Sequence, residues 1–477
     1  MDTTLLAALP PAYGDPDLPY RIRQAVRDSG RKLVVLDDDP TGVQTVHDTA
    51  VLTRWDAAMI ERELRAPSPL FFVLTNSRAK GRDEAIALNQ SVTRSVREAA
   101  RRAGTGVVFV SRGDSTLRGH FPDETDILSR AMNGVDGVIL CPAFIEGGRI
   151  TIDGVHYVNE PGGLTPVGDT EFARDATFGF RSSFLPDWVE EKSGGRIAAS
   201  SVRIIKLSDL REGGPDRVAS LLERVTEGQI AVLDAVSYRD IEVASLGILQ
   251  SEARGKRFVY RCGASLVRVR AGLGARPLLS RGDLLGAGFD PERPARGLVV
   301  VGSHVQRTTE QLERLLALPD TSGVEVSVAS ILESEASRMA TVTAARGAVE
   351  EALRGRRTPV VFSSRQVVGG ADRRHLEIGV QVSRALVDIV RDLGEKPDFI
   401  LSKGGITSSD IATEALAVRR AIVMGQARAG VSVWRLGPET ALAGVPYIVF
   451  PGNVGEPDTL ANLVNELCEG SPAVRAP

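Results

Sequence analysis

Cysteine and long apolar runs are scarce in this chain of 477 residues. The three cysteines, Cys141, Cys262 and Cys468, lie far apart, which argues against a disulfide framework or a cysteine metal site and favours a reducing compartment. No apolar run approaches the ~20 residues that span a bilayer, and the first residues do not follow a signal-peptide pattern. We therefore expect a cytoplasmic protein with no membrane partner.

The chain also lacks an excess of charge of one sign. Its formal net charge is -3, and no long basic block is present. Because nucleic-acid phosphates are bound through clustered lysine and arginine, we expect no nucleic-acid partner. What remains is an ordinary globular composition, with 43% hydrophobic and 25% charged residues. A chain of this length exceeds one ordinary core, which predicts two domains.

Short apolar runs alternate with amphipathic stretches in both halves of the chain. In the first half the runs are 32–37, 70–75, 106–111, 137–142, 230–235 and 257–262. In the second half they are 297–303, 324–330, 358–364, 397–403, 420–425 and 446–452. Continuous apolar strands that alternate with helices predict parallel sheets covered on both faces. We therefore expect two α/β domains, each with a mostly parallel sheet flanked by helices, and an active site in the cleft between them.

The domain boundary is predicted from composition. Residues 271–296 are rich in Gly, Pro and Arg and weakly periodic, which is typical of a linker between domains at 1–270 and 297–477. Residues 145–195 carry many Gly, Pro and Asp with little periodicity, and we interpret them as an irregular excursion over a sheet edge or cleft.

Polar residues follow the apolar runs of the first half, at 37–39, 75–78, 111–114 and 142–148. Open parallel sheets bind ligands at the carboxyl ends of their strands. These residues would form a rim of carboxylates, hydroxyls and guanidinium groups. Such a rim suits a small, anionic, hydroxylated ligand.

The corresponding rim of the second half, at 302–303, 363–365, 403–409 and 452–455, is mostly Gly, Ser and Thr. Glycine lets backbone N–H groups approach a phosphate, and the start of a following helix favours negative charge. The two halves therefore predict different ligands.

The first specific motif is Asp37, Asp38 and Asp39 at a strand end, followed by Pro40-Thr41-Gly42. One interpretation is a helix-capping aspartate with solvated neighbours. The other is a carboxylate cluster that binds Mg²⁺, binds a substrate hydroxyl or acts as a base, with an adjacent cation or donor relieving the mutual repulsion.

The second motif, "SRGDSTLRGH" at 111–120, places Arg112 and Arg118 around Asp114 and Ser115. It reads either as a capped helix start with surface arginines or as a clamp for a substrate carboxylate, because guanidinium binds carboxylates in a bidentate manner. Its position at a strand end favours the clamp.

The third motif, "LSKGGITSSDIA" at 401–412, has the form of a phosphate cradle: a strand, Lys403, two glycines, three hydroxyls and a helix. It is not a P-loop, whose lysine follows the second glycine directly. The alternative is a structural glycine turn with a helix cap.

Together and in this order, several segments resemble the four-carbon acid sugar kinases over residues 32–468, nearly the whole chain. The segments are "DDDPTGVQT", "TNSRA", "RGDSTLRGH", "CPAF", "FVYRCGASLVRVRAG", "VGSHVQRTTEQ", "SKGGITSSDIA" and "FPGNVGEPDTL". The resemblance implies an ATP-dependent kinase that phosphorylates the terminal hydroxyl of a four-carbon acid such as threonate, erythronate or 3-oxo-tetronate. The N-terminal domain would bind the acid and the C-terminal domain the nucleotide.

The resemblance also implies site residues. Contacts to ATP would come from Ser303, Gly404, Gly405, Ile406, Thr407 and Gly452, to which we add Lys403 and Ser408. The acid pocket would be lined by Asp38, Arg112, Asp114, Ser115 and Arg118, to which we add Arg78. Family members with assigned substrates usually read Asp-Asp-Leu-Thr-Gly where this chain has an additional aspartate and a proline, so the resemblance does not specify the particular acid.

For the mechanism, we expect one of Asp37, Asp38 and Asp39 to accept the proton of the attacking hydroxyl, with Asp38 as first choice. We expect another of them to hold Mg²⁺ and Lys403 to neutralise charge on the transferred phosphoryl group. The partners are thus a small sugar acid and ATP, and a homodimer is the assembly considered.

Two other functions fit parts of the sequence. A haloacid-dehalogenase-like phosphatase would use Asp37 as nucleophile and Asp39 as acid/base, with Lys403 and Asp410 as a later motif. A non-catalytic sugar-acid binder would need the arginines but not the phosphate cradles. Binding of ATP distinguishes the kinase from the phosphatase.

Overall fold

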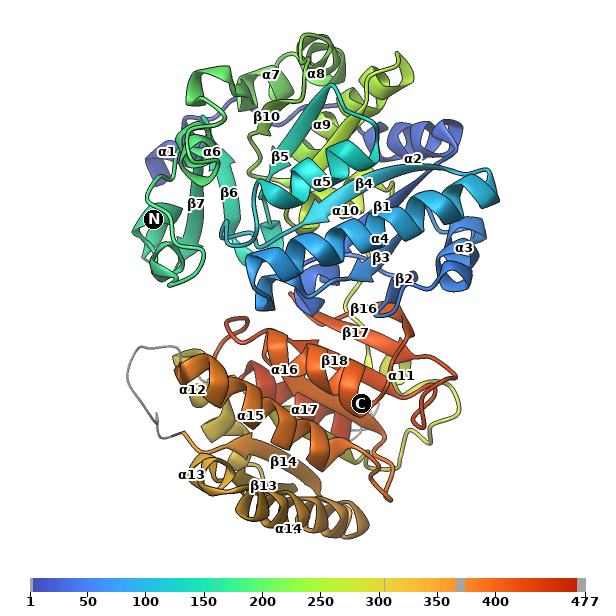
Figure 1. Cartoon of the computed structure of the whole chain (residues 1–477), viewed down its shortest axis with the longest axis vertical. Helices are drawn as coiled ribbons and strands as arrows, with labels where there is room; N and C mark the ends of the chain where they lie inside the picture. Colours follow the sequence, from blue (N-terminus) through green and yellow to red (C-terminus); the bar gives the residue numbers. More distant parts are fainter. Residues whose placement is uncertain (1–2, 161, 304, 366–373, 470–477) are drawn as a thin grey trace, which may run out of the picture. The chain divides into compact units, whose positions relative to one another are not determined.

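The computed structural model describes residues 3–160, 162–303, 305–365 and 374–469 (Figure 1). It divides the chain into two compact units, Met1–Ala275 (unit 1) and Arg276–Pro477 (unit 2). The division lies inside the predicted linker. Part of that segment is ordered as helix α11 (Arg281–Leu285), whose Arg281 guanidinium donates to backbone carbonyls of unit 2, including Leu467 O at 3.0 Å.

Unit 1 contains a parallel sheet in the order β2-β3-β1-β4-β11-β5-β10-β9 (Figure 1). Its strands are β1 (Arg31–Asp37), β2 (Thr49–Leu52), β3 (Leu70–Leu74), β4 (Gly106–Arg112), β5 (Gly137–Cys141), β9 (Arg203–Ile205), β10 (Gln229–Leu233) and β11 (Phe258–Cys262). The central strands are buried along nearly their whole length, as expected for apolar runs covered on both faces.

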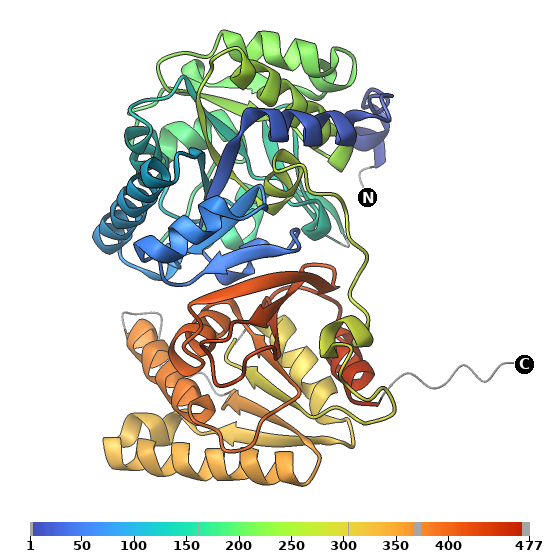
Figure 2. The ribbon, with the colours of Figure 1, turned by 90° about the vertical axis from the view of Figure 1, so that its right-hand side faces the viewer.

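Helices cover both faces of this sheet, and Figure 2 shows α4 and α2 on opposite sides of it. The helices of unit 1 are α1 (Thr3–Ala7), α2 (Leu18–Ser29), α3 (Ala57–Arg65), α4 (Arg82–Ala103), α5 (Asp123–Ala131), α6 (Leu185–Lys192), α7 (Leu207–Arg211), α8 (Gly214–Glu223), α9 (Tyr238–Ala253) and α10 (Ala264–Arg270). Helix α4 packs against α3 and α5, while α9 packs against α2, α8 and α10. The long helix α4 ends at Ala103 and is followed by Gly104 in the left-handed region (φ 65°), a common way to end a helix.

The segment 145–195 is more regular than we predicted. It forms a three-stranded antiparallel sheet of β6 (Arg149–Ile152), β7 (Val155–Glu160) and β8 (Gly163–Pro166), and then helix α6. Asp153 and Gly154 both have positive φ and form the tight turn of the first hairpin. The Gly and Asp residues that suggested irregular chain thus include hairpin turn residues.

Unit 2 contains a second sheet in the order β13-β14-β12-β15-β18-β17-β16. Its strands are β12 (Gly297–Val301), β13 (Thr321–Val326), β14 (Thr358–Ser363), β15 (Phe399–Lys403), β16 (Arg420–Arg428), β17 (Val431–Leu436) and β18 (Pro446–Phe450). The first five strands in this order are parallel, and β17 is antiparallel to both of its neighbours.

The helices of unit 2 also lie on both faces of its sheet. They are α11, α12 (Gln306–Leu316), α13 (Val328–Glu333), α14 (Glu335–Arg354), α15 (Arg374–Val390), α16 (Gly405–Asp410) and α17 (Thr459–Glu469). Figure 2 shows α15 and α17 on opposite sides. One core of the unit joins apolar residues of α11, α12 and α17 to the strands. Both units confirm the predicted α/β class with mostly parallel sheets.

The two sheets share one connection pattern. In unit 1, β2 lies two positions away from β1 in the sheet, and β3 lies between them. The next strand, β4, lies on the other side of β1. Unit 2 repeats this with β12, β13, β14 and β15. The connections therefore diverge between β1 and β4 and between β12 and β15. Such topological switch points leave a crevice at the carboxyl ends of the strands, where open α/β sheets bind ligands.

Across the described ranges, no helix is both long and apolar enough to cross a membrane.

Candidate functional site

The three aspartates at the end of β1 have different surroundings. Asp39 caps the short 3-10 helix η1 (Pro40–Val43), because its Oδ1 accepts from the Thr41 backbone N–H at 2.7 Å and from the Thr41 hydroxyl at 2.5 Å. The capping interpretation therefore holds for Asp39. Asp37 and Asp38 are each only 1% exposed, so they are not the solvated neighbours that this interpretation assumed.

Arg112, at the end of the adjacent strand β4, neutralises the inner two aspartates. The β1–β4 register places Asp37 opposite Arg112. The Arg112 Nη1 lies 3.1 Å from Asp37 Oδ1 and 3.5 Å from Asp38 Oδ1. Gly42 is needed here, since a Cβ at that position would lie 2.1 Å from both oxygens of Asp37. One buried guanidinium thus relieves the repulsion between adjacent carboxylates.

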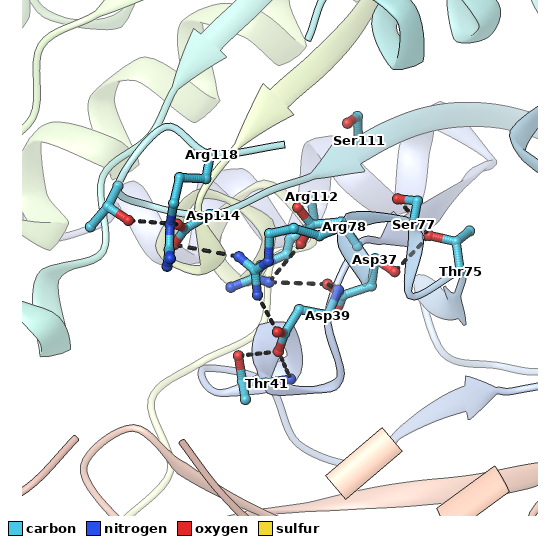
Figure 3. A network of polar contacts seen from close by, with 12 residues as sticks. Asp37, Asp39, Thr41, Thr75, Ser77, Arg78, Ser111, Arg112, Asp114 and Arg118 are labelled. Carbon is cyan, nitrogen blue, oxygen red and sulfur yellow. Dashed lines mark hydrogen bonds and ion pairs between the residues drawn. The ribbon is translucent and has the colours of Figure 1, made fainter. Parts of the chain in front are cut away.

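An outer layer of charges lies nearer the surface (Figure 3). Arg78, from the 3-10 turn η2 (Ser77–Ala79), pairs with Asp39, and its Nη1 lies 3.6 Å from Asp114 Oδ1. Arg118 Nε donates to Asp114 Oδ2 at 2.6 Å. Arg118 is the most exposed of the four, with 26% of its side chain accessible, and Arg78 follows with 18%. The structure therefore brings Arg78, Arg112, Asp114 and Arg118 together with the aspartates.

These surroundings separate the protonation behaviour of the carboxyl groups. Burial raises the pKa of Asp37 to about 7 against the attraction of Arg112, and burial likewise raises the pKa of Asp38. Burial acts on Asp39 too, but Arg78 and the Thr41 hydrogen bonds outweigh it and hold the Asp39 pKa below its usual range. Arg118 and Arg78 do the same for the pKa of Asp114. The inner pair is thus suited to exchange a proton, and the outer pair to stay ionised.

Ser115, the remaining predicted residue of the acid pocket, is buried, and its backbone carbonyl is bonded to His156. The Ser115 carbonyl oxygen lies 2.8 Å from His156 Nε2, and the Thr151 hydroxyl lies 2.9 Å from His156 Nδ1. Burial lowers the His156 pKa to about 4, so a neutral ring anchors this loop to strand β7. We did not predict a role for this histidine from the sequence.

Beneath the cluster lie two further charges that sequence reasoning missed. Arg261 on β11 donates to Glu124 Oε2 at 2.8 Å, and both side chains are about 5% exposed or less. Glu124 also accepts from the hydroxyls of Ser77 and Ser111, at 2.7 and 3.0 Å. The available signal was an arginine inside an otherwise apolar strand, "FVYRC".

In unit 2 the ends of β12, β15 and β18 approach one another without room for side chains. A Cβ on Gly302 would lie 2.1 Å from the Thr407 hydroxyl, and one on Gly452 would lie 2.7 Å from the Ser303 hydroxyl. Gly404 has φ 114°, and a Cβ there would lie 3.1 Å from the Ser303 Cβ. Ser303, Gly404, Thr407 and Gly452 are therefore brought together as predicted from the motifs, around the switch point of this sheet.

The other predicted residues of this rim differ in exposure. Gly405 is partly buried, and Ile406 is 58% exposed. Ser408 is fully buried and its hydroxyl donates to Ser402 O at 2.9 Å, which stabilises the turn.

Lys403 makes its contacts inside unit 2. Its ammonium is fully buried, donates to the carbonyls of Pro451 (2.9 Å) and Gly452 (3.4 Å), and lies 4.1 Å from the centre of the Phe450 ring. Burial, with a smaller contribution from Arg307, lowers the Lys403 pKa to about 7. A lysine so placed holds the loop after β18, and its role at a phosphoryl group stays a prediction. His304 of the neighbouring motif lies outside the described residues.

The cluster fits a metal ion poorly. In the part of the chain that the structure describes, no three His, Cys, Asp or Glu side chains come together in a way that could hold a metal. At the end of β1 the neutralising cations are guanidinium groups. A magnesium ion would therefore come mainly with the nucleotide phosphates, as Mg²⁺ often does.

Comparisons with known proteins agree with this division. Residues 33–270 match the model of a sugar-binding N-terminal domain, and residues 298–460 match the model of a nucleotide-binding C-terminal domain. This is the two-domain architecture of one enzyme family. The chain belongs to the four-carbon acid sugar kinase family. The two matched ranges fall in units 1 and 2, in that order.

Individual relatives are more distant. The D-erythronate kinase of Heliobacterium modesticaldum (strain ATCC 51547 / Ice1) is 26% identical over 318 residues, which are 63% of this chain and 64% of the relative. The chain thus aligns with less than two thirds of that relative's length. A crystal structure from Salmonella typhimurium LT2 has a TM-score of 0.63 at 18% identity, over 91% of this chain and 98% of that one. A Haemophilus influenzae protein of the family DUF1537 has a TM-score of 0.57 at 17% identity, over 91% and 99%. These two likenesses show the fold.

Proposed function

We propose that this protein is an ATP-dependent kinase that phosphorylates the terminal hydroxyl of a four-carbon sugar acid of the threonate, erythronate or 3-oxo-tetronate type. One observation carries the proposal: the residues that follow the strands at the topological switch point differ in character between the two units. In unit 1 these are charged side chains, and in unit 2 they are close-packed glycine loops. The name of the D-erythronate kinase relative supports the same chemistry.

The acid is assigned to unit 1. Arg118 and Arg78 are the accessible guanidinium groups, and a carboxylate ligand would be bound by either through paired N–H donors. Arg112, Asp114 and Ser115 shape the pocket from behind. Because Arg78 also exerts the strongest attraction on Asp38, a substrate carboxylate that drew Arg78 outward would uncover that aspartate.

Asp38 is our choice for the base. The buried Oδ2 atoms of Asp37 and Asp38 find no hydrogen-bond partner among the described residues. Both oxygens of Asp37, however, are covered by Gly42. In the reaction, the substrate hydroxyl oxygen bonds to the γ-phosphorus of ATP, the bond from phosphorus to the β,γ-bridging oxygen breaks, and Asp38 takes the hydroxyl proton. The products are the phosphorylated acid and ADP.

The nucleotide is assigned to unit 2, with Ser303, Gly404, Gly405, Ile406, Thr407 and Gly452 as the contacts and Lys403 and Ser408 as the residues that hold their loops. Glycine loops leave backbone N–H groups free to approach phosphates. Mg²⁺ bound with those phosphates would supply charge neutralisation. Direct transfer requires the two ligands to meet, so the interdomain cleft stays a prediction, as does the homodimer.

The phosphatase alternative is less well supported. It requires Asp37 to attack phosphorus, yet Gly42 lies directly against this carboxylate, since a Cβ added there would be 2.1 Å from both of its oxygens. It also leaves the glycine loops of unit 2 without a ligand.

The test is a screen of ATP consumption across tetronates, pentonates and their keto forms. We expect turnover with a tetronate, and we expect Asp38→Asn to abolish it while nucleotide binding persists. Asp28→Asn, at an exposed aspartate on α2, is the matched control and should behave as the wild type. Near-normal turnover by Asp38→Asn would disprove the assignment of the base, and the absence of ATP consumption with every acid would disprove the kinase.

A further inference from the structure

The loop that carries the acid-binding residues rests on a buried guanidinium. Arg261 Nη2 donates to the backbone carbonyl of Arg118 at 3.1 Å. A Cβ on Gly113 would lie 2.1 Å from Arg261 Cζ, and one on Gly119 would lie 2.7 Å from Arg261 Nη2. The two glycines of "RGDSTLRG" therefore allow residues 113–119 to lie directly against this side chain.

Glu124 completes the arrangement from helix α5. It binds Arg261 Nη1 at 2.8 Å and is only 3% exposed. Arg261 and Glu124 thus form an ion pair that is removed from water and carries no net charge. Such a pair is costly to bury, and replacing it by apolar residues is often neutral for stability. Its presence directly beneath the site calls for a role other than stability.

Asp38 also lies close to Gly119. The Cβ that would meet Arg261 Nη2 at 2.7 Å would also meet Asp38 Oδ2 at 3.2 Å. The charged groups that act on Asp38 come from several neighbouring elements: Arg78 of η2, Arg112 of β4, Arg261 of β11 and Glu124 of α5, together with Asp37 of its own chain segment. Arg78 and Arg112 also form ion pairs with other carboxylates, whereas the opposite charges of Arg261 and Glu124 counteract each other at Asp38.

We propose that Arg261 and Glu124 are positioning residues, a buried pair that holds the loop 113–119 under the acid site and balances the charge that acts on Asp38. The proposal deepens the proposed function, on which its choice of Asp38 as base rests. Neither residue need touch the substrate. The pair acts through Asp38, on which Arg261 and Glu124 have opposite effects, and through the Arg118 carbonyl.

The two partners therefore predict opposite shifts. Arg261→Met removes the cation and should move the titration of Asp38, and the acid limb of the kcat profile with it, to higher pH by about one unit. Glu124→Gln leaves Arg261 unopposed and should move both to lower pH by a similar amount. Arg261→Met/Glu124→Gln should return the titration to near the wild-type position but raise KM for the acid, because the loop loses its support.

A second buried pair in the same unit supplies a matched control. Arg270 Nη2 lies 2.5 Å from Glu252 Oε2, both side chains are 4% exposed or less, and neither is among the groups that act on Asp38. Arg270→Met/Glu252→Gln removes an equally buried ion pair. It should leave the Asp38 titration, KM and kcat near their wild-type values.

The experiment follows the ¹³C signal of the Asp38 carboxyl in the full-length protein, assigned by its loss in Asp38→Asn, together with kcat and KM against pH. Opposite shifts of the Asp38 titration in the two single variants support the proposal. If the single variants do not fold, a raised KM for the acid in the double variant supports it. Unchanged titration in folded single variants, or a double variant that matches the control pair, would overturn it. A failure of the kinase assignment is separate, because it would abolish turnover in the wild type while the carboxyl titration still shifts.

Discussion

Asp37 provides the most quantitative test of the charge cluster, through the substitution Asp37→Asn. Its folded pKa of about 7 lies above the ordinary value of 3.8, because burial outweighs the attraction of Arg112. The folded state therefore binds this proton more tightly than the unfolded state between these two pH values. The resulting stability is fully present below pH 3.8 and is lost as the pH rises to about 7.

The magnitude follows from the width of the pH window. From pH 5 to the folded pKa of about 7 there are about two pH units, each worth about 1.4 kcal/mol, so the wild type should lose about 3 kcal/mol from this group. Asp37→Asn keeps an oxygen for Arg112 but has no proton to lose. The variant should therefore be as stable as the wild type near pH 5 and about 3 kcal/mol more stable at pH 8.

The assay is urea unfolding of the full chain at pH 5 and pH 8, followed by tryptophan fluorescence. Trp434 belongs to unit 2, so all proteins compared should carry Trp434→Phe, which leaves Trp55 and the buried Trp188 to report unit 1. The quantity to follow is the difference in the free energy of unfolding between the variant and the wild type, and how this difference changes with pH. Both proteins carry Trp434→Phe, so its effect on stability cancels in the difference.

Asp39→Asn is the control within the same cluster. The Asp39 pKa is lowered in the folded state. The contribution of this carboxylate to protein stability is therefore present above the unfolded pKa of 3.8 and is lost only as the pH falls through the still lower folded pKa. This variant should be less stable than the wild type by the same amount at pH 5 and pH 8. If the free energies of unfolding of the wild type and Asp37→Asn change with pH in the same way, so that their difference does not grow toward pH 8, the view that burial holds Asp37 protonated is refuted.

Two further predictions concern unit 2. Gly302→Ala places a Cβ 2.1 Å from the Thr407 hydroxyl and should weaken binding of an ATP analogue about tenfold or more by calorimetry, whereas Gly347→Ala, an open position on α14, should bind normally and unfold at slightly higher temperature. Equal affinity in the two variants would remove Gly302 from the nucleotide site. Lys403 has a folded pKa of about 7, below its usual 10.5, so the unfolded state binds its proton more tightly between these values and the wild type should gain stability as the pH rises from 7 toward 10. Lys403→Met should lose that gain when unfolding is followed through Trp434, and an unchanged slope would show that the ammonium is not desolvated.

The positions of most strands follow from the sequence. The apolar runs at 32–37, 70–75 and 106–111 became β1, β3 and β4, because strands buried on both faces need continuous apolar stretches. Strands β2, β9 and β17 were not predicted, and neither were β6, β7 and β8 of the segment 145–195. The first two are only four and three residues long, too short to show a periodic signal.

The local sequence also indicated where ligands would bind but not how the side chains pair. Residues after the strands were expected at one sheet edge because parallel strands share their direction. That Arg112 faces Asp37, and that Arg78 pairs with Asp39, depends on strand register and on a turn that no local pattern specifies. Lys403 shows the same limit, since its ammonium turned toward the carbonyls after β18, 48 residues further along the chain.

What the sequence by itself determined is the α/β class, the two-domain order and the chemical character of each strand-end rim, because these follow from apolar periodicity and from residue types that come directly after strands. Only the tertiary structure decided which carboxyl groups are buried, which guanidinium neutralises each of them, and that Arg261 and Glu124 lie beneath Asp38. Burial and pairing arise between segments far apart in the chain, and the free energy of a charge depends on those neighbours more than on its own residue type.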